Sequence, residues 1–472
     1  MLPRDSLLYT SGKVYEEGLE DMASPLVKDP AFYREFFWLT AMMGLQSLLS
    51  YSVNLADNMM LGQYSETALA ASSIVNQIQY LLQMTSVNGL AIGGVILVAQ
   101  YWGRQDHESV RRIIALTCKF AFGTGVLFCI VCATVPETIV GLLTTETAVA
   151  AEAVRYLKVI SWTYLVFPVQ ATLVFCLRGV GITRLGPAVS LVSLVLNIVG
   201  NWIFIFGNLG APELGIEGAA WSSLIARVVE ITIVLVFAAR NTILPIKPKD
   251  FIAPDAKFLK DFLKVALPVM GEGLTFGMAN IFQIAILGRL TEPVIAANSI
   301  AITMHQIVTV FGFGAANSSS IMIGRAIGSG NMDVLKSYAR TMQLLFVGIG
   351  IATSAVLFFS IEFVLGFYAI SGETYELATS MMHILCITVI CSCYQYPCMC
   401  GIIAGGGNTM FAFLMDVIFT LGVAITSAAL SAFVFGWPPL VTFALLKIDQ
   451  VLKCIPNAIV VNHYRWAHDL TR

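Results

Sequence analysis

The chain contains two copies of one sequence unit, related by a constant offset that carries Leu61 onto Leu287. The segment LGQYSETALAASSI, which begins at Leu61, aligns without a gap on LGRLTEPVIAANSI, which begins at Leu287, and seven of the fourteen positions are identical. The same offset places GVGIT, from Gly179, on GGGNT, from Gly405. Because this repeat offset holds from the first pair of segments to the second, the fold must be built from two similar halves.

Composition places both copies in a membrane. Hydrophobic residues make up 57% of the 472 residues and charged residues only 12%, which is about half the charged share of a soluble domain. Apolar windows of about 20 residues recur along the chain. They lie at 36–60, 68–101, 112–134, 156–178, 186–208, 216–238, 262–288, 293–324, 340–361, 380–403, 411–433 and 438–461. We therefore predict an all-α integral membrane protein with twelve transmembrane helices in two pseudo-symmetric six-helix lobes.

Each copy holds an even number of windows, so both copies should enter the membrane from the same side. The predicted segments are a cytoplasmic leader at 1–35, an N-terminal lobe at 36–240, a cytoplasmic linker at 241–261, a C-terminal lobe at 262–461 and a cytoplasmic tail at 462–472. Internally repeated polytopic membrane proteins are most often secondary transporters, whose substrate site lies at the repeat interface.

Lys and Arg residues predict the orientation. Placing both termini in the cytoplasm puts 21 of the 27 Lys and Arg on that side, whereas the outside loops hold acids such as Glu66, Glu137 and Glu146. We therefore expect a multi-pass protein of the cytoplasmic (inner) cell membrane. The leader has no short apolar core, so no cleavable signal is expected. The ten cysteines show no disulfide spacing, and no basic, aromatic-interleaved patch predicts nucleic-acid binding.

Asp57 is the first acid inside a predicted span. A charge in hydrocarbon costs at least about 2.5–3.5 kcal/mol, so it needs a partner, a water-filled cavity or a bound cation. A carboxylate in a cavity can hold a proton, an alkali cation or a cationic substrate, and competition among these is a physical basis for antiport. The alternative is an interfacial acid that is simply solvated. The repeat offset pairs Asp57 with the neutral Gln283.

Glu272 is the corresponding acid early in the seventh span. It follows Pro268 by one helical turn, and Gly271, Gly273 and Gly277 beside it allow close approach. Its depth in the span favours a functional role. The alternative is an acid that stabilises a helix N-terminus.

Amide and hydroxyl side chains accompany these acids. Asn197 and Asn201 lie four residues apart on one helical face, and Ser222 and Ser223 follow in the next span. Such groups can complete the oxygen shell of a cation or join helices by hydrogen bonds. Asn76, Gln79 and Gln83 share a helical spacing in the second span, and the repeat offset carries Gln79 onto His305, either a proton relay or a packing residue.

Other polar residues in the spans have a structural interpretation. Asp416 is a further intramembrane acid, and Asp449 and Lys453 are spaced for mutual neutralisation within one helix. The run CSCYQYPCMC resembles a metal site only superficially, because Pro397 interrupts an apolar span there and nothing else marks a ligand set. No metal site is expected, and Pro168 and Pro397 are expected to kink their helices.

The motifs resemble those of one known family. DNMMLGQYSETALAASS, GLAIGGVILVAQYWGRQD, RGVGIT, LNIVGNWIFIFG and PELGIEGAAWSS, followed in the second half by LGRLTEPVIAANS, GRAIGSGN and GGGNT, are similar to the signatures of multidrug and toxic compound extrusion (MATE) transporters. The resemblance covers nearly the whole chain after the leader. It implies a V-shaped bundle of two six-helix lobes that exports organic cations and other amphipathic compounds in exchange for H⁺ or Na⁺.

The resemblance also implies a coupling site. In one branch of the family a first-span Asp, with an Asn and an Asp in the fifth span and a Thr in the sixth, binds the cation; these positions match Asp57, Asn197, Asn201 and Ser223. Asn201 departs from that pattern because it replaces an acid. Another branch uses acids in spans seven and ten, which here are Phe276 and a position near Ser392. Glu272, one turn from Phe276, is the candidate substitute.

Together these observations predict a monomeric secondary active multidrug exporter. The predicted cation or proton coupling residues are Asp57, Asn197, Asn201, Ser223 and Glu272, and the predicted substrate cavity contains Asn76, Gln79, Gln83, His305 and Gln283. Neither a cofactor nor a catalytic residue is expected, only H⁺ or Na⁺ as the coupling ion. A lipid or polysaccharide-precursor flippase of related fold is the alternative, although few bases lie within the spans. A hydrolase would need clustered catalytic groups, and the five His are scattered.

Overall fold

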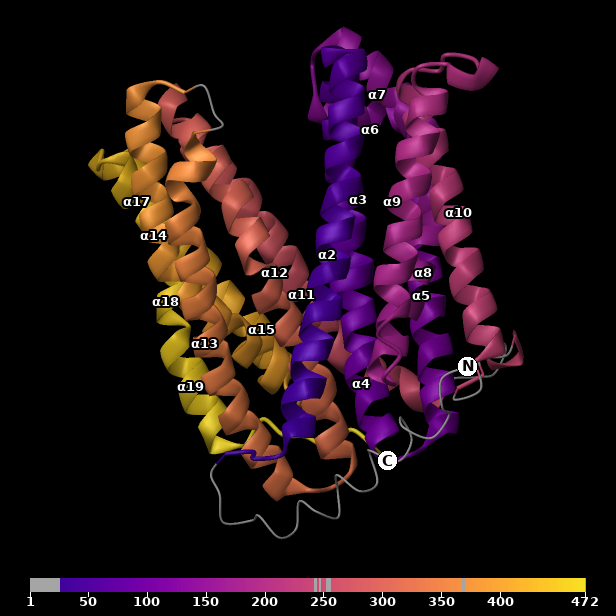
Figure 1. Ribbon diagram of the computed structural model, residues 1–472, viewed down its shortest axis with the longest axis vertical. Helices are drawn as coiled ribbons and strands as arrows, with labels where there is room; N and C mark the ends of the chain where they lie inside the picture. The colour runs from indigo at the N-terminus through magenta and orange to yellow at the C-terminus, as the bar shows by residue number, and fades with distance from the viewer. Residues whose placement is uncertain (1–25, 242–243, 246–247, 252–255, 367–369, 472) are drawn as a thin grey trace. The chain divides into compact units, whose positions relative to one another are not determined.

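The computed structural model describes residues 26–471 except 242–243, 246–247, 252–255 and 367–369 (Figure 1). Most of the predicted leader therefore lies outside the described residues. The α-helices are α2 (Pro30–Tyr64), α3 (Glu66–Thr85), α4 (Ile92–Gly103), α5 (His107–Thr134), α6 (Pro136–Leu143), α7 (Thr147–Ile160), α8 (Thr163–Gly179), α9 (Leu185–Phe204), α10 (Ile216–Arg240), α11 (Ala256–Leu287), α12 (Glu292–Gly328), α13 (Met332–Leu365), α14 (Gly372–Tyr396), α15 (Thr409–Met415), α16 (Thr426–Leu430), α17 (Pro439–Leu446), α18 (Ile448–Leu452) and α19 (Cys454–His463).

Short π-helical and 3₁₀ segments interrupt or join these helices. The π-helical segments are η1 (Ser86–Ala91), η4 (Pro397–Ile403), η5 (Asp416–Ile425) and η6 (Ser431–Phe435), and the 3₁₀ segments are η2 (Asn208–Gly210) and η3 (Pro248–Phe251). The change from α14 to η4 falls at Pro397, which has no N–H to continue the α-helical hydrogen bonds. The described residues thus confirm the all-helical prediction.

The structure shows nine helical stretches among the described residues that are long and apolar enough to cross a membrane, or ten if α7 and α8 form one span bent by 55°. Two predicted spans are in neither count. The window at 36–60 lies in α2, which carries Asp57, and the window at 438–461 is broken into α17, α18 and α19. A membrane protein of many spans is therefore supported, and the number twelve stays a prediction.

The backbone repeats with the predicted offset. That offset carries Gly181 onto Gly407, and both adopt the left-handed conformation with φ of 96° and 98°. Each follows the end of a helical segment in the same way: Gly181 N donates to Arg178 O at 2.9 Å and Gly407 N to Ala404 O at 2.9 Å. A residue with a Cβ is disfavoured at such a φ, so glycine is retained in both copies.

The described chain forms two compact units. The N-terminal unit comprises the described residues of Met42–Ile281 with Ala412–Val417, and the C-terminal unit comprises those of Phe282–Phe411 and Ile418–Arg472 together with residues 26–41. These units group the first part of α2 with the C-terminal half and most of α11 with the N-terminal half. The lobe boundaries predicted from the sequence stay a prediction.

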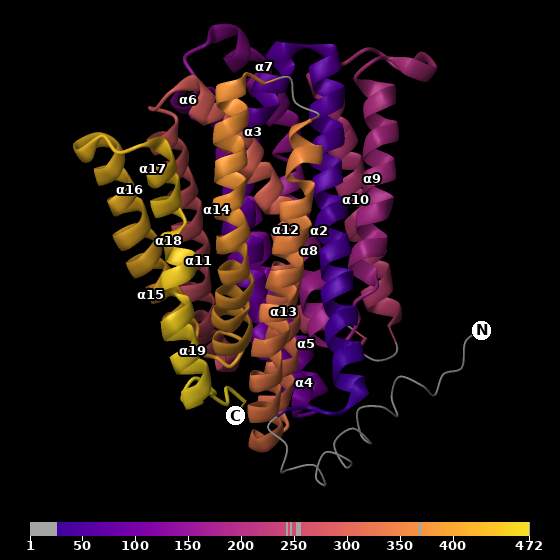
Figure 2. The same cartoon turned by 60° about the vertical axis from the view of Figure 1, so that its left-hand side comes forward.

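Close helix packing organises the N-terminal unit. α9 packs along α10, α5 along α8, and α3 along α7. α9 and α10 lie side by side in Figures 1 and 2. Gly125 permits the α5–α8 approach, because a Cβ there would lie 2.2 Å from the carbonyl oxygen of Tyr164. Apolar residues including Leu61, Val75, Leu157 and Ile216 form a core of this unit.

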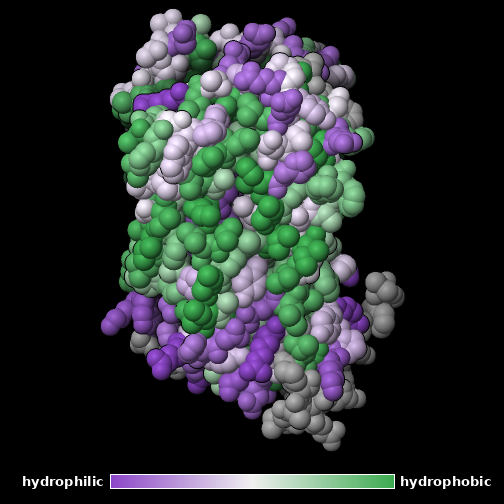
Figure 3. All heavy atoms as spheres, turned by 90° about the vertical axis from the view of Figure 1, so that its left-hand side faces the viewer, coloured by the Kyte–Doolittle hydropathy of each residue, from purple (hydrophilic) through white to green (hydrophobic). Residues whose placement is uncertain are grey.

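The C-terminal unit is built around α12, α13 and α14, which contact one another. One of its cores includes Phe36 of α2 packed with Met322, Phe346 and Trp466. Large apolar side chains on α13 face outward: Phe359 and Phe363 are 81% and 71% exposed. On the face shown in Figure 3, hydrophobic side chains cover the middle of the helices and hydrophilic side chains gather at the lower end. Such a surface suits contact with lipid chains.

Candidate cation-binding site

A hydrogen-bonded cluster in the N-terminal unit joins three helices around Asp57. Asp57 lies on α2, while Asn197 and Asn201 lie one turn apart on α9. Asn201 Nδ2 donates to Asp57 Oδ1 at 2.5 Å and to Asn197 Oδ1 at 3.3 Å, and Asn197 Nδ2 donates to Ser223 Oγ of α10 at 3.3 Å. Four residues that the sequence singled out are therefore brought together.

The position of this cluster depends on how closely α9 and α10 approach. Gly200 lies between the two asparagines, and a Cβ at that position would lie 2.4 Å from Ser222 Oγ. The absence of a side chain lets Ser222 Oγ donate to the carbonyl oxygen of Asn197 at 3.0 Å. This bond ties the backbone of α9 to α10.

One acceptor of the cluster is buried without a donor. Asn197 and Asn201 are 2% and 0% exposed, and Asn201 Oδ1 accepts no hydrogen bond from the described residues. Buried amide oxygens are nearly always satisfied by a donor or a bound ion. Asn201 Oδ1 and the half-buried carboxylate of Asp57 are therefore oxygen ligands suited to a small cation.

The cluster borders a small cavity. Its lining comes from α2, α3, α7, α8, α9 and α10 and comprises Val53, Asn54, Asp57, Asn76, Gln79, Tyr156, Ile160, Thr163, Ser193, Asn197, Ser223, Ala226 and Arg227. The cavity has a free volume of about 30 Å³, and one water needs roughly 10–15 Å³ on that measure. It therefore suits one or two waters or a single small cation, and is too small for a drug molecule.

Arg227 supplies a positive charge to the same cavity, and the sequence interpretation missed it. Its Nη1 donates to Glu230 Oε2 at 2.7 Å, and the Glu230 side chain is only 3% exposed. The guanidinium also lies over the Phe167 ring, 4.8 Å from its centroid. Two charges three residues apart within the sixth apolar window were the available signal, because ionisable groups inside spans need partners.

Only some of the remaining predicted site residues lie at this cavity. Asn76 and Gln79 line the cavity, but Gln83 on the same helix does not, and its side chain is exposed. Glu272 belongs to the N-terminal unit on α11 and is half-buried, outside the cavity lining. His305 and Gln283 belong to the C-terminal unit, where Lys447 Nζ donates to Gln283 Oε1 at 3.1 Å. Lys447 was another residue that the sequence interpretation did not single out.

Comparison with known proteins identifies relatives that match most of the chain. The MatE family model matches residues 43–203 and 268–430, one segment in each repeat. The chain is 30% identical to the probable multidrug resistance protein NorM of Rhizobium meliloti, over 68% of this chain and 69% of that protein. It is 23% identical to the NorM of Thermotoga maritima over 82% of each chain. It is also 28% identical to the uncharacterized transporter YisQ of Bacillus subtilis, over 63% of this chain and 65% of that protein.

Solved structures share the fold. A crystal structure of MATE in complex with MaL6 matches with a TM-score of 0.82 at 18% identity, covering 91% of this chain and 96% of that one. A multidrug resistance MATE family transporter in an outward-facing conformation matches with a TM-score of 0.80 at 20% identity, covering 91% and 94%. The expected family, fold class and membrane association are thus confirmed together: the chain belongs to the MATE family of membrane transporters.

Proposed function

We propose that this chain is a secondary active exporter of organic cations and other amphipathic compounds, which it exchanges for H⁺ or Na⁺ at the carboxylate of Asp57. The observation that carries the proposal is the hydrogen bond from Asn201 to Asp57 at the edge of a cavity within the helices. Placing a carboxylate within an apolar span costs free energy, which a bound cation or proton offsets. The multidrug resistance names of the NorM relatives support drug-like cargo.

The cavity is large enough for the coupling ion but not for the cargo, so we assign the two to different places. A free volume of about 30 Å³ accommodates a proton on the carboxylate or a partly dehydrated Na⁺. Asp57 and Ser223 Oγ of the lining are the proposed oxygen ligands, with the buried Oδ1 of Asn201, whose amide contacts Asp57. Asn76 and Gln79 line this cavity and are assigned to it. Gln83, His305 and Gln283 stay the proposed cargo-binding residues. Cargo and ion then compete through the charge state of Asp57, which is the linkage that antiport requires.

Orientation and surroundings complete the proposal. The transporter is a monomer in the cytoplasmic (inner) cell membrane with both termini in the cytoplasm, as the distribution of Lys and Arg predicts. Cargo enters from the cytoplasmic side, and the ion reaches Asp57 from outside and favours release. Glu272 is a second proposed coupling carboxylate, because it is a half-buried acid on α11 of the same unit.

The test is efflux of a cationic dye from proteoliposomes under a pH gradient and, separately, under a Na⁺ gradient. The gradient that drives wild-type efflux identifies the ion. Asp57→Asn should reduce gradient-driven efflux at least about tenfold, equivalent to about 1.4 kcal/mol of lost coupling. Glu146→Gln, which alters an exposed acid outside the cavity, is the matched control and should keep it. Glu272→Gln tests the second carboxylate. Unchanged efflux in Asp57→Asn would remove Asp57 from the mechanism.

A further inference from the structure

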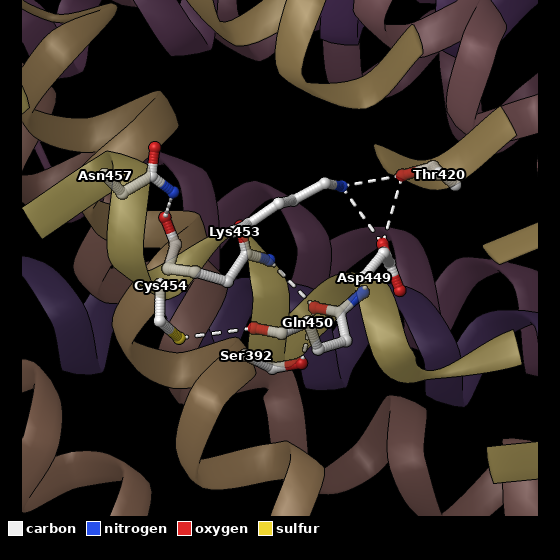
Figure 4. Close-up of polar contacts among 8 residues, drawn as sticks. Ser392, Thr420, Asp449, Gln450, Lys453, Cys454 and Asn457 are labelled. Atoms are coloured by element: carbon white, nitrogen blue, oxygen red, sulfur yellow. Dashed lines mark hydrogen bonds and ion pairs between the residues drawn. The ribbon is translucent and has the colours of Figure 1, made fainter. Parts of the chain in front are cut away.

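A buried ion pair lies at the centre of a polar network in the C-terminal unit (Figure 4). Lys453 Nζ lies 3.0 Å from Asp449 Oδ2, and both side chains are only 3% exposed. Thr420 of η5 completes a triangle, because Lys453 Nζ donates to its Oγ1 at 2.6 Å and that hydroxyl donates to Asp449 Oδ2 at 3.0 Å. The ammonium is therefore held by a carboxylate oxygen and a hydroxyl oxygen, both common ligands of alkali and alkaline-earth cations.

Amide groups from neighbouring helices extend the network. Gln450 Nε2 donates to Asp449 Oδ2 at 3.1 Å, and Ser392 Oγ and Gln395 Nε2 of α14 both donate to Gln450 Oε1 at 2.8 Å. Asn457 Nδ2 of α19 donates to the carbonyl oxygen of Gln395 at 3.1 Å. The side-chain oxygens of Gln395 and Asn457 are buried and accept no hydrogen bond from the described residues. The network is thus rich in oxygen acceptors.

The internal repeat relates this network to the Asp57 cavity. The repeat offset carries Gly210 onto Gly436, and both are left-handed, with φ of 82° and 60°. Pro212 and Leu214 correspond in the same way to Pro438 and Leu440. The register therefore continues without a gap into α10 and α18.

This register aligns residues of the two sites directly. It places Ser223 on Asp449 and Arg227 on Lys453. Ser223 and Arg227 both line the Asp57 cavity. The base is kept in both copies, as Arg227 and Lys453. The acid differs, because the counterpart of Asp57 is the neutral Gln283, and the carboxylate lies instead four residues before the base in the chain.

We propose that the C-terminal unit contains a second monovalent-cation site, repeat-related to the Asp57 cavity, in which the Lys453 ammonium is the resident cation. The ammonium occupies the place between Asp449 and Thr420 that a soluble cation would otherwise take. The comparison with the Asp57 site rests on the proposed function, but the occupancy by Lys453 is tested without transport. If the transport experiment contradicts the role of Asp57, the stability experiment on Lys453 can still be interpreted, and the reverse also holds.

The experiment removes the resident cation and offers a soluble one. Lys453→Met deletes the charge while keeping a long apolar side chain, and Asp449→Asn/Lys453→Met is the matched control without the carboxylate. The thermal unfolding midpoint of detergent-purified protein is measured in NaCl and in N-methyl-D-glucamine chloride at equal ionic strength. Na⁺ should raise the midpoint of Lys453→Met by roughly 2–4 °C. The wild type and the double variant should not respond.

A proton is the other cation that the Asp449 carboxylate can take once the ammonium is removed. Lowering the pH from about 8 to about 6 should then raise the midpoint of Lys453→Met relative to the double variant. The nearby ionisable groups are Lys447, which donates to Gln283, and the thiols of Cys391 and Cys454. Both variants keep these groups, so their titration cancels in the comparison.

A second variant covers the case in which Lys453→Met does not fold. Lys453→Ala leaves space for methylammonium, which should raise its midpoint, whereas Asp449→Asn/Lys453→Ala should not respond. Selective stabilisation by Na⁺ or methylammonium supports the proposal, whereas selective stabilisation by protons alone, which any buried carboxylate without its partner shows, overturns it. Equal responses of each single variant and its double variant in all three conditions overturn it, because a purely structural ion pair loses stability without gaining affinity for a soluble cation.

Discussion

The side-chain amide of Asn201 donates its hydrogen bond to Asp57 Oδ1 at 2.5 Å, joining residues that are 144 positions apart in the chain. The same amide nitrogen also donates to Asn197 Oδ1 at 3.3 Å. The resemblance to one branch of the family implies an acid at position 201. This chain has an asparagine there, whose amide donates a hydrogen bond, so the cluster holds one carboxylate rather than two. The cluster therefore has a single acidic group, that of Asp57, and Arg227 lines the same cavity.

Asn201→Asp should increase the affinity of the cluster for Na⁺. A second carboxylate beside Asp57 repels it unless a cation or a shared proton lies between them. We expect a Na⁺ dissociation constant at least about tenfold lower than in the wild type, which corresponds to about 1.4 kcal/mol. Na⁺-dependent thermal stabilisation measures it. Asn201→Leu is the control of similar size, and a response of Asn201→Asp no larger than that of Asn201→Leu would contradict the assigned ligands.

Gly200→Ala should disturb the site through helix packing. The added methyl group would meet Ser222 Oγ, which must move and weaken its bond to the Asn197 carbonyl. Overpacking of this kind lowers the free energy of unfolding by about 1–3 kcal/mol. Gly123→Ala on α5 is the control, because nothing lies within 4 Å of a Cβ there. Equal unfolding midpoints and equal efflux for the two variants would show that close α9–α10 contact is dispensable.

Arg227→Gln should destabilise the protein more than Arg227→Gln/Glu230→Gln. Removing Arg227 leaves the Glu230 carboxylate buried without its partner, at a cost of about 3 kcal/mol. The double variant replaces both charges by amides and should recover most of that free energy of unfolding. Unfolding of the two variants and of Glu230→Gln forms a double-mutant cycle. Simple additivity in that cycle would mean that Arg227 is stabilised by other groups.

Asp106 should stabilise the start of α5 in a pH-dependent manner. It caps that helix by accepting from Ser109 N at 3.0 Å and Ser109 Oγ at 2.6 Å. Burial acts to raise the pKa of Asp106, but the hydrogen bonds from Ser109 and the charges of Lys257 and Arg104 outweigh it, so the pKa is lowered.

Because the folded-state pKa of Asp106 lies below the unfolded value, its contribution is complete above about pH 4 and is lost as the pH falls through the folded pKa. Asp106→Ala should lower the free energy of unfolding by about 1 kcal/mol near neutral pH. Asp106→Asn keeps a capping side chain without the titration. A stability profile of Asp106→Asn that falls in acid as steeply as the wild type would argue against this assignment.

The sequence by itself determined the class of the molecule and the members of the hydrogen-bonded cluster around Asp57. The repeat offset predicted two similar halves, and Gly181 and Gly407 adopt nearly the same φ because both copies need a residue without a Cβ at that turn. Asp57 was identified because a charge inside an apolar span costs free energy unless it has a partner, a water-filled cavity or a bound cation. The spacing of Asn197 and Asn201 placed both amides on one face of a helix.

Only the tertiary structure decided which polar residues meet. Periodicity fixes the face of a helix on which a side chain lies, but not the neighbouring helix or the height at which it is met. Gln83 shares the spacing of Gln79 yet lies outside the cavity, whereas Arg227 lines it. Asp449 and Lys453 were predicted to neutralise each other. Their contact with Thr420, 29 residues before Asp449 in the chain, depends on helix packing that no local pattern encodes.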